Sequence, residues 1–180
     1  MVGALADRII PPDADTPGGR EAGCAVYLDR QLAGGYGRSE GLYVQGPESP
    51  ATPAKLYRSA LAALENHCKS LPGAPSWVSL SAAQQDEILR HLEDGSLSLS
   101  AAGPAPVDAK HFFETMMNDL QQGFFADPVY GGNRDMCAWK MIGFPGARYD
   151  YRDWVGRHNE RYPHGPVSIM GSPDWNPTRS

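Results

Sequence analysis

The chain carries at residues 123–146 the stretch GFFADPVYGGNRDMCAWKMIGFPG. Asp127-Pro128 and Gly131-Gly132-Asn133 are turn chemistry, because Pro fixes φ, Gly reaches positive φ and Asn can bond its own backbone. Large rings crowd around these turns, and each ring must be buried in this domain or against a partner. The rings belong to Phe124, Phe125, Tyr130, Trp139 and Phe144. What buries them is therefore the question on which function depends.

Arg134 and Asp135 directly follow the Gly-Gly-Asn run. A guanidinium among aromatic rings can pair with a carboxylate through two hydrogen bonds and can stack on a ring. One interpretation is that Arg134 and Asp135 lock the loop onto its own domain. The other is that they specify a partner surface, since interfaces favour aromatic residues, Met and Arg. The sequence leaves both interpretations open.

Helix signals occupy most of the chain before this stretch. Thr52-Pro53, the Ser81-Ala-Ala-Gln84 capping box and Asp108 mark helix starts, and Gly34-Gly35, Pro72-Gly73 and Gly95 mark ends. The predicted helices cover residues 3–10, 21–32, 53–71, 82–94 and 109–122, followed by a short helix that Asn133 caps and Gly143 ends.

Apolar spacing predicts the buried face of each helix. The first stripe is Ala25, Leu28 and Leu32. The second is Tyr57, Ala60, Leu61, Leu64 and Cys68, in which Cys68 is interpreted as a small buried hydrophobe. The strongest helix has the seam Phe113, Met116, Met117 and Leu120, with Gly123 as its expected terminator.

The fold class predicted is mostly α, a small helical domain with long irregular arms and an aromatic Gly/Pro-rich loop. The whole chain, 1–180, is interpreted as a single domain, which its length allows. Residues 34–52 are expected to form an extended arm, and residues 147–180 an irregular C-terminal tail that is stable only if docked.

Composition excludes several function classes. A net charge of -5 argues against nucleic acid as a partner, because its phosphates require a basic surface. No apolar run approaches the about 20 residues that a spanning helix needs, so any membrane attachment is expected to be indirect, through partners. The cysteines Cys24, Cys68 and Cys137 are isolated, and an odd count leaves at least one free thiol. A disulfide between two of them stays open, without a choice of pair.

Known catalytic patterns are missing from the sequence, which has no Gly-x-Ser-x-Gly, phosphate-binding loop, His-Glu-x-x-His or covalent haem motif. We therefore assign no catalytic, cofactor-binding or metal residue to this chain. Two alternatives are kept. One is a self-sufficient small metal-dependent enzyme that uses the His158/His164 region, and the other is a cytoplasmic interaction module.

The stretch Gly123–Pro128 through Tyr130–Met136, with Trp139-Lys140 and Ile142–Gly146, resembles the signature of the small subunit (gamma chain, or subunit 3) of gluconate 2-dehydrogenase. The opening residues 6–11, 17–18 and 20–23 are similar to the start of that family. The resemblance covers both ends of the chain and, more loosely, the helices between them.

The resemblance implies an accessory, non-catalytic role in a sugar or sugar-acid dehydrogenase complex. The implied partners are a large FAD-dependent dehydrogenase subunit and a multihaem cytochrome c subunit that passes electrons to quinone. FAD and haem c, with an iron–sulfur cluster as a further candidate, are expected in those partners and no cofactor in this chain. The small subunit is expected to stabilise the flavoprotein and assist its export, in a chaperone-like manner.

The resemblance also implies a periplasmic location, peripheral to the inner membrane through the complex. The sequence contains no Arg-Arg pair or other export signal, so the export route stays open. The interface or loop-locking residues expected are Phe124, Phe125, Tyr130, Asn133, Arg134, Asp135, Trp139 and Phe144.

Overall fold

The computed structural model describes residues 1–40, 52–73, 76–99, 107–148 and 150–171. The described residues form α-helices joined by turns, with isolated bridges and no β-strand, so the prediction of a mostly α fold is confirmed. The helices are α1 (Val2–Ile9), α2 (Cys24–Ala33), α3 (Gly35–Arg38), α4 (Pro53–Ser70), α5 (Ala82–Glu93), α6 (Ala109–Phe125) and α7 (Cys137–Ile142). Short 3-10 turns lie at Trp77–Ser79 (η2), Pro128–Tyr130 (η3), Arg134–Met136 (η4) and Arg152–Trp154 (η5).

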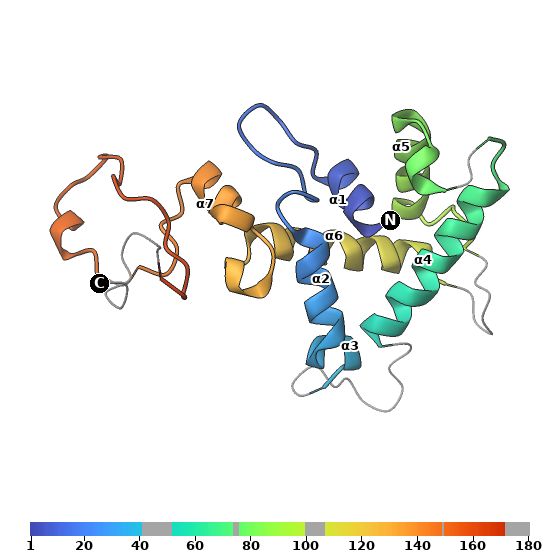
Figure 1. Ribbon diagram of the computed structural model, residues 1–180, viewed down its shortest axis with the longest axis horizontal. Coiled ribbons are helices and arrows are strands. Elements are labelled where there is room, and N and C mark those ends of the chain that lie inside the picture. The colour runs from blue at the N-terminus through green and yellow to red at the C-terminus, as the bar shows by residue number, and fades with distance from the viewer. Residues whose placement is uncertain (41–51, 74–75, 100–106, 149, 172–180) are drawn as a thin grey trace.

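Helix α6 lies at the centre of the helical body. It contacts α2, α4, α5 and α7, and Figure 1 shows it running across the middle of the molecule with α2 crossing it. Helix α1 packs between α2 and α5, where Arg8 donates two hydrogen bonds to the Asp86 carboxylate. That pairing raises the pKa of Arg8 and lowers the pKa of Asp86. No helix in the described part of the chain has the length and apolar character needed to cross a bilayer.

Local capping signals predicted the starts of α4, α5 and α6 correctly. Helix α4 begins at Pro53 after Thr52, although the Thr52 side chain makes no capping hydrogen bond. The Ser81 hydroxyl accepts from the Gln84 amide at 3.3 Å, and the Gln84 side chain accepts from the Ser81 amide at 2.9 Å. The Asp108 carboxylate accepts from the His111 amide at 3.0 Å. Each of these bonds satisfies a backbone donor that the first turn of a helix leaves unpaired.

The buried stripe of α4 is confirmed, but the predicted seam of α6 is wrong in two positions. Tyr57, Ala60, Leu64 and Cys68 are buried as expected, while Leu61 is only partly buried. On α6 the buried residues are Ala109, Phe112, Met116, Asp119, Leu120, Gly123 and Phe124. Met117 is exposed and Phe113 only partly buried, because the Phe112 ring occupies the core, edge-on to Tyr57 at 5.5 Å.

Gly123 does not terminate α6, which continues to Phe125. Its missing side chain serves packing instead, since a Cβ at Gly123 would lie 2.8 Å from Cδ1 of Tyr27. Tyr27 is a buried residue of α2 that the predicted stripe of Ala25, Leu28 and Leu32 omitted. The close approach of α2 to α6 therefore requires glycine at this point.

The chain after α2 folds back instead of extending. Gly34 ends α2 as expected, but Gly35–Arg38 form the helical turn α3, so the predicted arm over 34–52 is wrong at its start. Residues 41–51 lie outside the described residues, so the remainder of the arm stays a prediction. The fold-back places the Tyr36 side chain against α6.

A buried carboxylate joins three of the helices. Asp119 on α6 is 3% exposed, and it accepts hydrogen bonds from the hydroxyls of Tyr57 on α4 at 2.8 Å and Tyr36 on α3 at 3.0 Å. Burial raises the pKa of Asp119, because removal from water disfavours the ionised form, and the two hydroxyls partly offset this effect. The pKa values of Tyr36 and Tyr57 are raised as well. Burial is the larger cause, and the negative charge of Asp119 is the second.

The tail forms an irregular lobe beyond α7. Figure 1 shows the chain after α7 extending away from the helical body. Among its described residues the only helical element is η5, and rings of Tyr151, Trp154, Tyr162 and His164 pack against one another. Residues 172–180 lie outside the described part of the chain. The irregular tail predicted over 147–180 and the assignment of 1–180 to one domain both stay predictions.

Tyr57→Phe is expected to lower the free energy of unfolding by about 2 kcal/mol, because it removes a hydrogen bond to a buried charged group. Urea denaturation of the isolated chain measures this change. Tyr130→Phe is the control, since that hydroxyl is on an exposed residue, and it should change stability by less than about 0.5 kcal/mol. Equal effects of the two substitutions would contradict the role given to Asp119.

Asp119→Asn is expected to change how stability depends on pH. Because the folded-state pKa of Asp119 is raised, its favourable contribution is complete below the unfolded pKa and is lost as pH rises through the folded pKa. The stability of the wild type relative to Asp119→Asn should therefore fall over the pH range above about 4, the ordinary pKa of an aspartate, since Asn does not titrate and other groups cancel in the difference. Urea denaturation across this range tests the expectation, and a pH-independent difference would refute it.

Candidate interaction surface

The side chain of Asn133 holds the turn between α6 and α7 by hydrogen bonds to the backbone on both sides, and we call this contact the Asn133 clamp. Asn133 is fully buried, and its Nδ2 donates to the Ala126 carbonyl at 2.9 Å while its Oδ1 accepts from the Ala138 amide at 2.9 Å. Its φ of 44° lies in the left-handed region, which Asn tolerates better than most residues. The expectation that Asn133 caps the helix ending at Gly143 holds only in part: Asn133 directly precedes η4 and Met136 is the N-cap of α7, but the Asn133 side chain accepts from an amide in the first turn of α7.

Glycines let this turn lie directly on α2 and α6. A Cβ on Gly132 would lie 1.9 Å from the Gly123 carbonyl oxygen, and one on Gly23 would lie 2.6 Å from the Gly131 carbonyl oxygen. Gly23 also has a φ of 87°, so α2 begins at Cys24 rather than at the predicted Glu21. The sequence signal for this contact is the Gly-Gly pair, but the partner surfaces lie too far along the chain to be identified from it.

Trp139 is a locking residue. Its ring is buried, its Nε1 donates to the Phe125 carbonyl at 2.8 Å, and its ring meets Phe144 edge-on at 5.2 Å. Phe124 is also buried in the core. In contrast, the rings of Phe125, Tyr130 and Phe144 are exposed. The aromatic loop thus divides into an inward set, with Asn133, Phe124 and Trp139, and an outward set.

Arg134 and Asp135 lock the loop through the backbone and not through their charges. The Arg134 amide donates to the Ala22 carbonyl at 2.9 Å. Both side chains are exposed and make no hydrogen bond or ion pair within the described ranges. Asp135 has a φ of 56°, which turns the chain toward α7. The side-chain lock that the sequence left open is therefore not formed, and both charged groups stay available to a partner.

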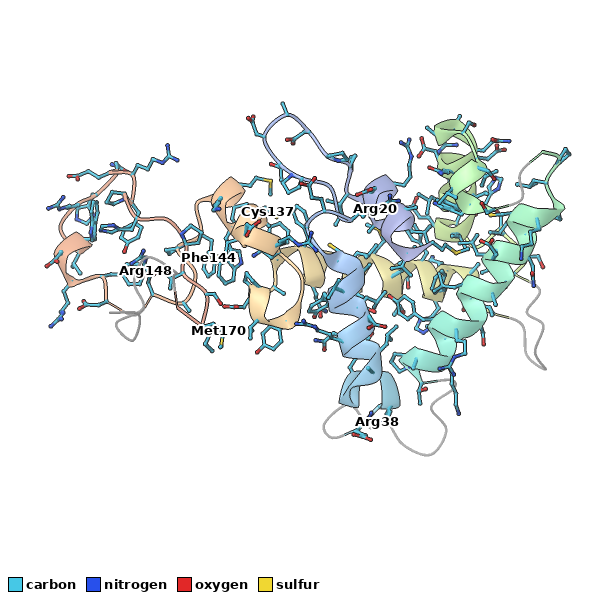
Figure 2. The ribbon with its side chains drawn as sticks, in the orientation of Figure 1. Arg20, Arg38, Cys137, Phe144, Arg148 and Met170 are labelled. Carbon is cyan, nitrogen blue, oxygen red and sulfur yellow. The ribbon has the colours of Figure 1, made fainter. Side chains whose placement is uncertain are left out.

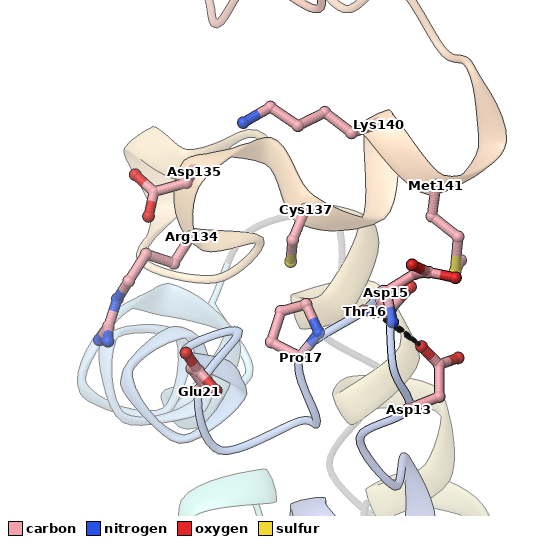
Figure 3. Close-up of a pocket in the computed structure, with 10 residues that line it drawn as sticks. All are labelled: Asp13, Asp15, Thr16, Pro17, Glu21, Arg134, Asp135, Cys137, Lys140 and Met141. Carbon is pink, nitrogen blue, oxygen red and sulfur yellow. Dashed lines mark hydrogen bonds between the residues drawn. The ribbon is translucent and has the colours of Figure 1, made fainter.

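Arg134 and Asp135 line one side of an open hollow of about 690 Å³ between η4, α7 and residues 13–21. Figure 3 shows Arg134 and Asp135 on one side of the hollow, Asp13 and Asp15 on the other, and Cys137 between them. Asp13 is committed to its own turn, since Oδ1 accepts from the amides of Asp15 and Thr16. The hollow carries charges of both signs, with the acidic side chains Asp13, Asp15, Glu21 and Asp135 outnumbering the basic Arg134 and Lys140.

Helix α7 is the common wall of three hollows. Lys140 lines both the mixed-charge hollow and a second one beside the tail, and Met141 lines both the mixed-charge hollow and an apolar one of about 370 Å³. Met141, Ile142 and Phe144 are exposed apolar residues. We call Lys140, Met141, Ile142 and Phe144 the α7 ridge. Clustered exposed apolar groups beside unpaired charges are typical of a protein–protein contact.

The apolar hollow extends the ridge over the helical body. It is lined by Ile9 and Ile10 at the end of α1, by Met117, and by Phe125 and Met141, among others. Met117 also borders a neighbouring hollow on α5 and α6. This hollow explains why the buried face predicted for α6 is wrong at Met117, because Met117 and Phe125 point toward the hollow and not into the core. The sequence had placed Met117 inside.

The three thiols are free and protected. Cys24 and Cys68 are buried, and Cys137 is partly buried. Burial raises the pKa of Cys24 to about 12, and burial also raises the pKa of Cys68 and Cys137. A thiol whose pKa is raised holds little thiolate at neutral pH and is a poor nucleophile. The interpretation of Cys68 as a buried hydrophobe is confirmed.

The His158/His164 region does not assemble a ligand set. His158 is exposed, and the His164 ring packs edge-on against Tyr162 at 5.4 Å. Across the described ranges, no group of three or more His, Cys, Asp or Glu side chains lies close enough to hold a metal ion. The metal-enzyme alternative therefore gains no support from this geometry.

Asp127 was missed as a site residue. Its Oδ1 accepts from the Val129 amide at 3.0 Å and from the Ser168 hydroxyl at 2.6 Å, and its Oδ2 accepts from the Ile169 amide at 2.8 Å. One carboxylate thus closes η3 and ties the tail to the signature loop. The Asp-Pro dipeptide signals the turn, but nothing in the sequence signals the partner 41 residues away.

Asn133→Ala is expected to lower the free energy of unfolding by about 3 kcal/mol, because it removes two hydrogen bonds and leaves alanine at positive φ. Asn133→Gly removes the same hydrogen bonds without the backbone cost, so it should be more stable than Asn133→Ala by about 1 kcal/mol. Urea denaturation measures both, with the exposed Asn118→Ala on α6 as control. An unchanged stability in Asn133→Ala would exclude the clamp.

Comparison with known proteins gives one match. The family described as gluconate 2-dehydrogenase subunit 3 matches residues 1–146, which ends with the signature loop and leaves the tail outside. No curated protein and no solved structure matches the chain. The matched region contains all seven named α-helices, the Asn133 clamp and the α7 ridge. Because the match covers most of its length, this chain belongs to the gluconate 2-dehydrogenase subunit 3 family.

Proposed function

We propose that this chain is the non-catalytic accessory subunit of a membrane-bound sugar or sugar-acid dehydrogenase, and that it binds and stabilises the large FAD-dependent subunit through the α7 ridge. The observation that carries the proposal is the α7 ridge itself, which the family signature builds and exposes. Membership of a subunit family supports a complex with other dehydrogenase subunits.

The inward half of the signature supports the same proposal. Asn133 and Trp139 fix α7 by hydrogen bonds to the backbone of the α6 end, so the ridge is held rigidly before any partner arrives. A preformed surface loses less conformational entropy on binding than a flexible one. The ridge is therefore suited to a lasting subunit contact.

The proposed complex passes electrons from the flavin of the large subunit through a multihaem cytochrome c subunit to quinone, on the periplasmic side of the inner membrane. In it the small subunit stabilises the folded flavoprotein and assists its export. The groups with raised pKa, such as Cys24 and Asp119, are buried in the helical body, which supports a structural role for them and not a catalytic one. Substrate choice then lies with the flavoprotein.

Ile142→Asp is expected to reduce recovery of the complex at least tenfold when the chain is co-expressed with its large subunit. Ile142 is 57% exposed, so the isolated chain should fold normally, whereas a charge placed in a buried contact opposes binding. Val78→Asp is the matched control, since Val78 is an apolar residue 65% exposed on η2, away from α7.

The measurement is the amount of flavin-loaded large subunit that co-purifies with the tagged chain, together with the substrate KM of what is recovered. Recovery should fall for Ile142→Asp alone, and KM should stay within twofold of the wild type. Normal recovery of Ile142→Asp, or loss of the large subunit even with the wild-type chain, would reject the proposal. A sharply raised KM at intact assembly would instead place the α7 ridge at the substrate site.

A further inference from the structure

A second hollow, of about 490 Å³, lies between the end of α7 and the tail loop of residues 161–166. We call it the tail cleft. Trp139, Lys140, Gly143 and Phe144 line it from the family-matched body, and residues 161–166 line it from the tail. Figure 2 shows Phe144 between α7 and the tail, with Arg148 on the tail side. The cleft is therefore formed by two segments, residues 139–144 and residues 161–166, that are separate in the sequence.

The charges on the tail cleft are all of one sign. Lys140 and Arg161 line it, the His164 imidazole adds a further polar group, and no carboxylate is among its lining residues. Neither Lys140 nor Arg161 has an ion pair with another described residue. This local excess of positive charge stands out in a chain whose net charge is -5.

Two carboxylates of the tail, Asp150 and Glu160, pair with arginines that do not line the cleft. Asp150 is paired with Arg152 at 2.5 Å, and Glu160 lies 3.8 Å from Arg157. Both pairs are formed within the tail, on residues that do not line the cleft. Lys140 also lines the mixed-charge hollow with Asp135, but no ion pair joins Lys140 or Arg161 to a carboxylate of the described residues, so both cations can pair with an acidic group of a partner.

The tail wall of the cleft is held in place. Arg148 donates from Nη2 to the Gly165 carbonyl at 3.0 Å, and its guanidinium lies 5.7 Å from the Tyr162 ring centroid. The Ala147 amide donates to the Val167 carbonyl at 2.7 Å, and Asp127 binds Ser168 beyond it. These contacts fix both ends of the loop, so the cleft is formed without a partner.

The floor of the cleft is aromatic. Trp139 and Phe144 meet edge-on there, and Phe144 exposes part of its ring to solvent. Such a floor binds an apolar side chain, while Lys140 and Arg161 at the rim bind carboxylates. The combination suits a peptide segment that carries acidic residues beside an apolar one.

We propose that the tail cleft binds an acidic surface segment of the large dehydrogenase subunit, with carboxylates of that segment paired to Lys140 and Arg161 and an apolar side chain laid on Phe144. This inference rests on the proposed function, because it takes the large subunit as the partner. The inference goes further in two respects. It includes the tail, which lies outside the family match, in the contact with the large subunit, and it specifies that the contacted surface of the large subunit is acidic.

Carbodiimide cross-linking of the purified complex tests the proposal, because the reagent joins an amine to a carboxylate only at ion-pair distance. The expected product links Lys140 to an Asp or Glu of the large subunit, identified by mass spectrometry. Lys140→Arg is the matched control, since it keeps the charge and removes the amine, and should bind normally without that cross-link. The remaining lysines, Lys55, Lys69 and Lys110, lie on α4 and α6 and should not react with the partner.

Charge reversal supplies an independent measurement. Lys140→Glu with Arg161→Glu should raise the Kd for the large subunit at least tenfold and reduce the dependence of Kd on salt. Lys55→Glu with Arg58→Glu makes the same change of charge on α4, which Figure 1 shows on the other side of α2 from α7, and should leave Kd within twofold. Unfolding curves confirm that both variants fold.

The outcomes separate this inference from the proposed function. If the wild-type chain binds the large subunit but the Lys140 cross-link is absent and the reversed variant binds normally, the cleft inference is wrong and the accessory function stands. If the wild-type chain does not bind the large subunit at all, the proposed function itself is wrong. Loss of binding that an added small carboxylate such as acetate reproduces at millimolar concentration would assign the cleft to a free anion and overturn the proposal.

Discussion

Two hydrogen bonds between the Asn133 side chain and the backbone are the constraint on which the interaction surface depends. One amide group joins the Ala126 carbonyl, just past the end of α6, to the Ala138 amide in the first turn of α7. This bridge closes the turn between α6 and α7 and fixes the start of α7 relative to the end of α6. The Trp139 indole then fastens α7 to the Phe125 carbonyl, so the exposed groups of the α7 ridge point outward from a fixed base.

The body that supports this turn is organised by α6. On its core face there is no room for a side chain at position 123, because Tyr27 of α2 lies directly against Gly123. The same face carries the buried carboxylate of Asp119. A buried carboxylate that only two hydroxyls satisfy is costly, and it links α3 and α4 to α6 in one specific arrangement. Arg8 and Asp86 make a comparable but more exposed link between α1 and α5.

The sequence predicted what depends on near neighbours and failed where the partner lies far along the chain. The Ser81–Gln84 box and the Asp108 cap are local, so these helix starts were correct. Gly123 was taken as a terminator because its partner Tyr27 is distant, and Asp119 was not singled out at all because its donors come from two other helices. Phe124 and Phe125 are adjacent and alike in sequence, yet only packing decides that the first is buried and the second exposed.

The central claim is that the family signature uses its inward residues to hold α7 and presents its outward residues to another subunit. Hydrogen–deuterium exchange of the chain alone and in complex with its large subunit tests this claim most directly. The account predicts slower exchange in the complex at residues 140–146 and 161–166, with α4 unchanged. Slower exchange confined to α4 and α5, with residues 140–146 exchanging as in the isolated chain, would contradict it.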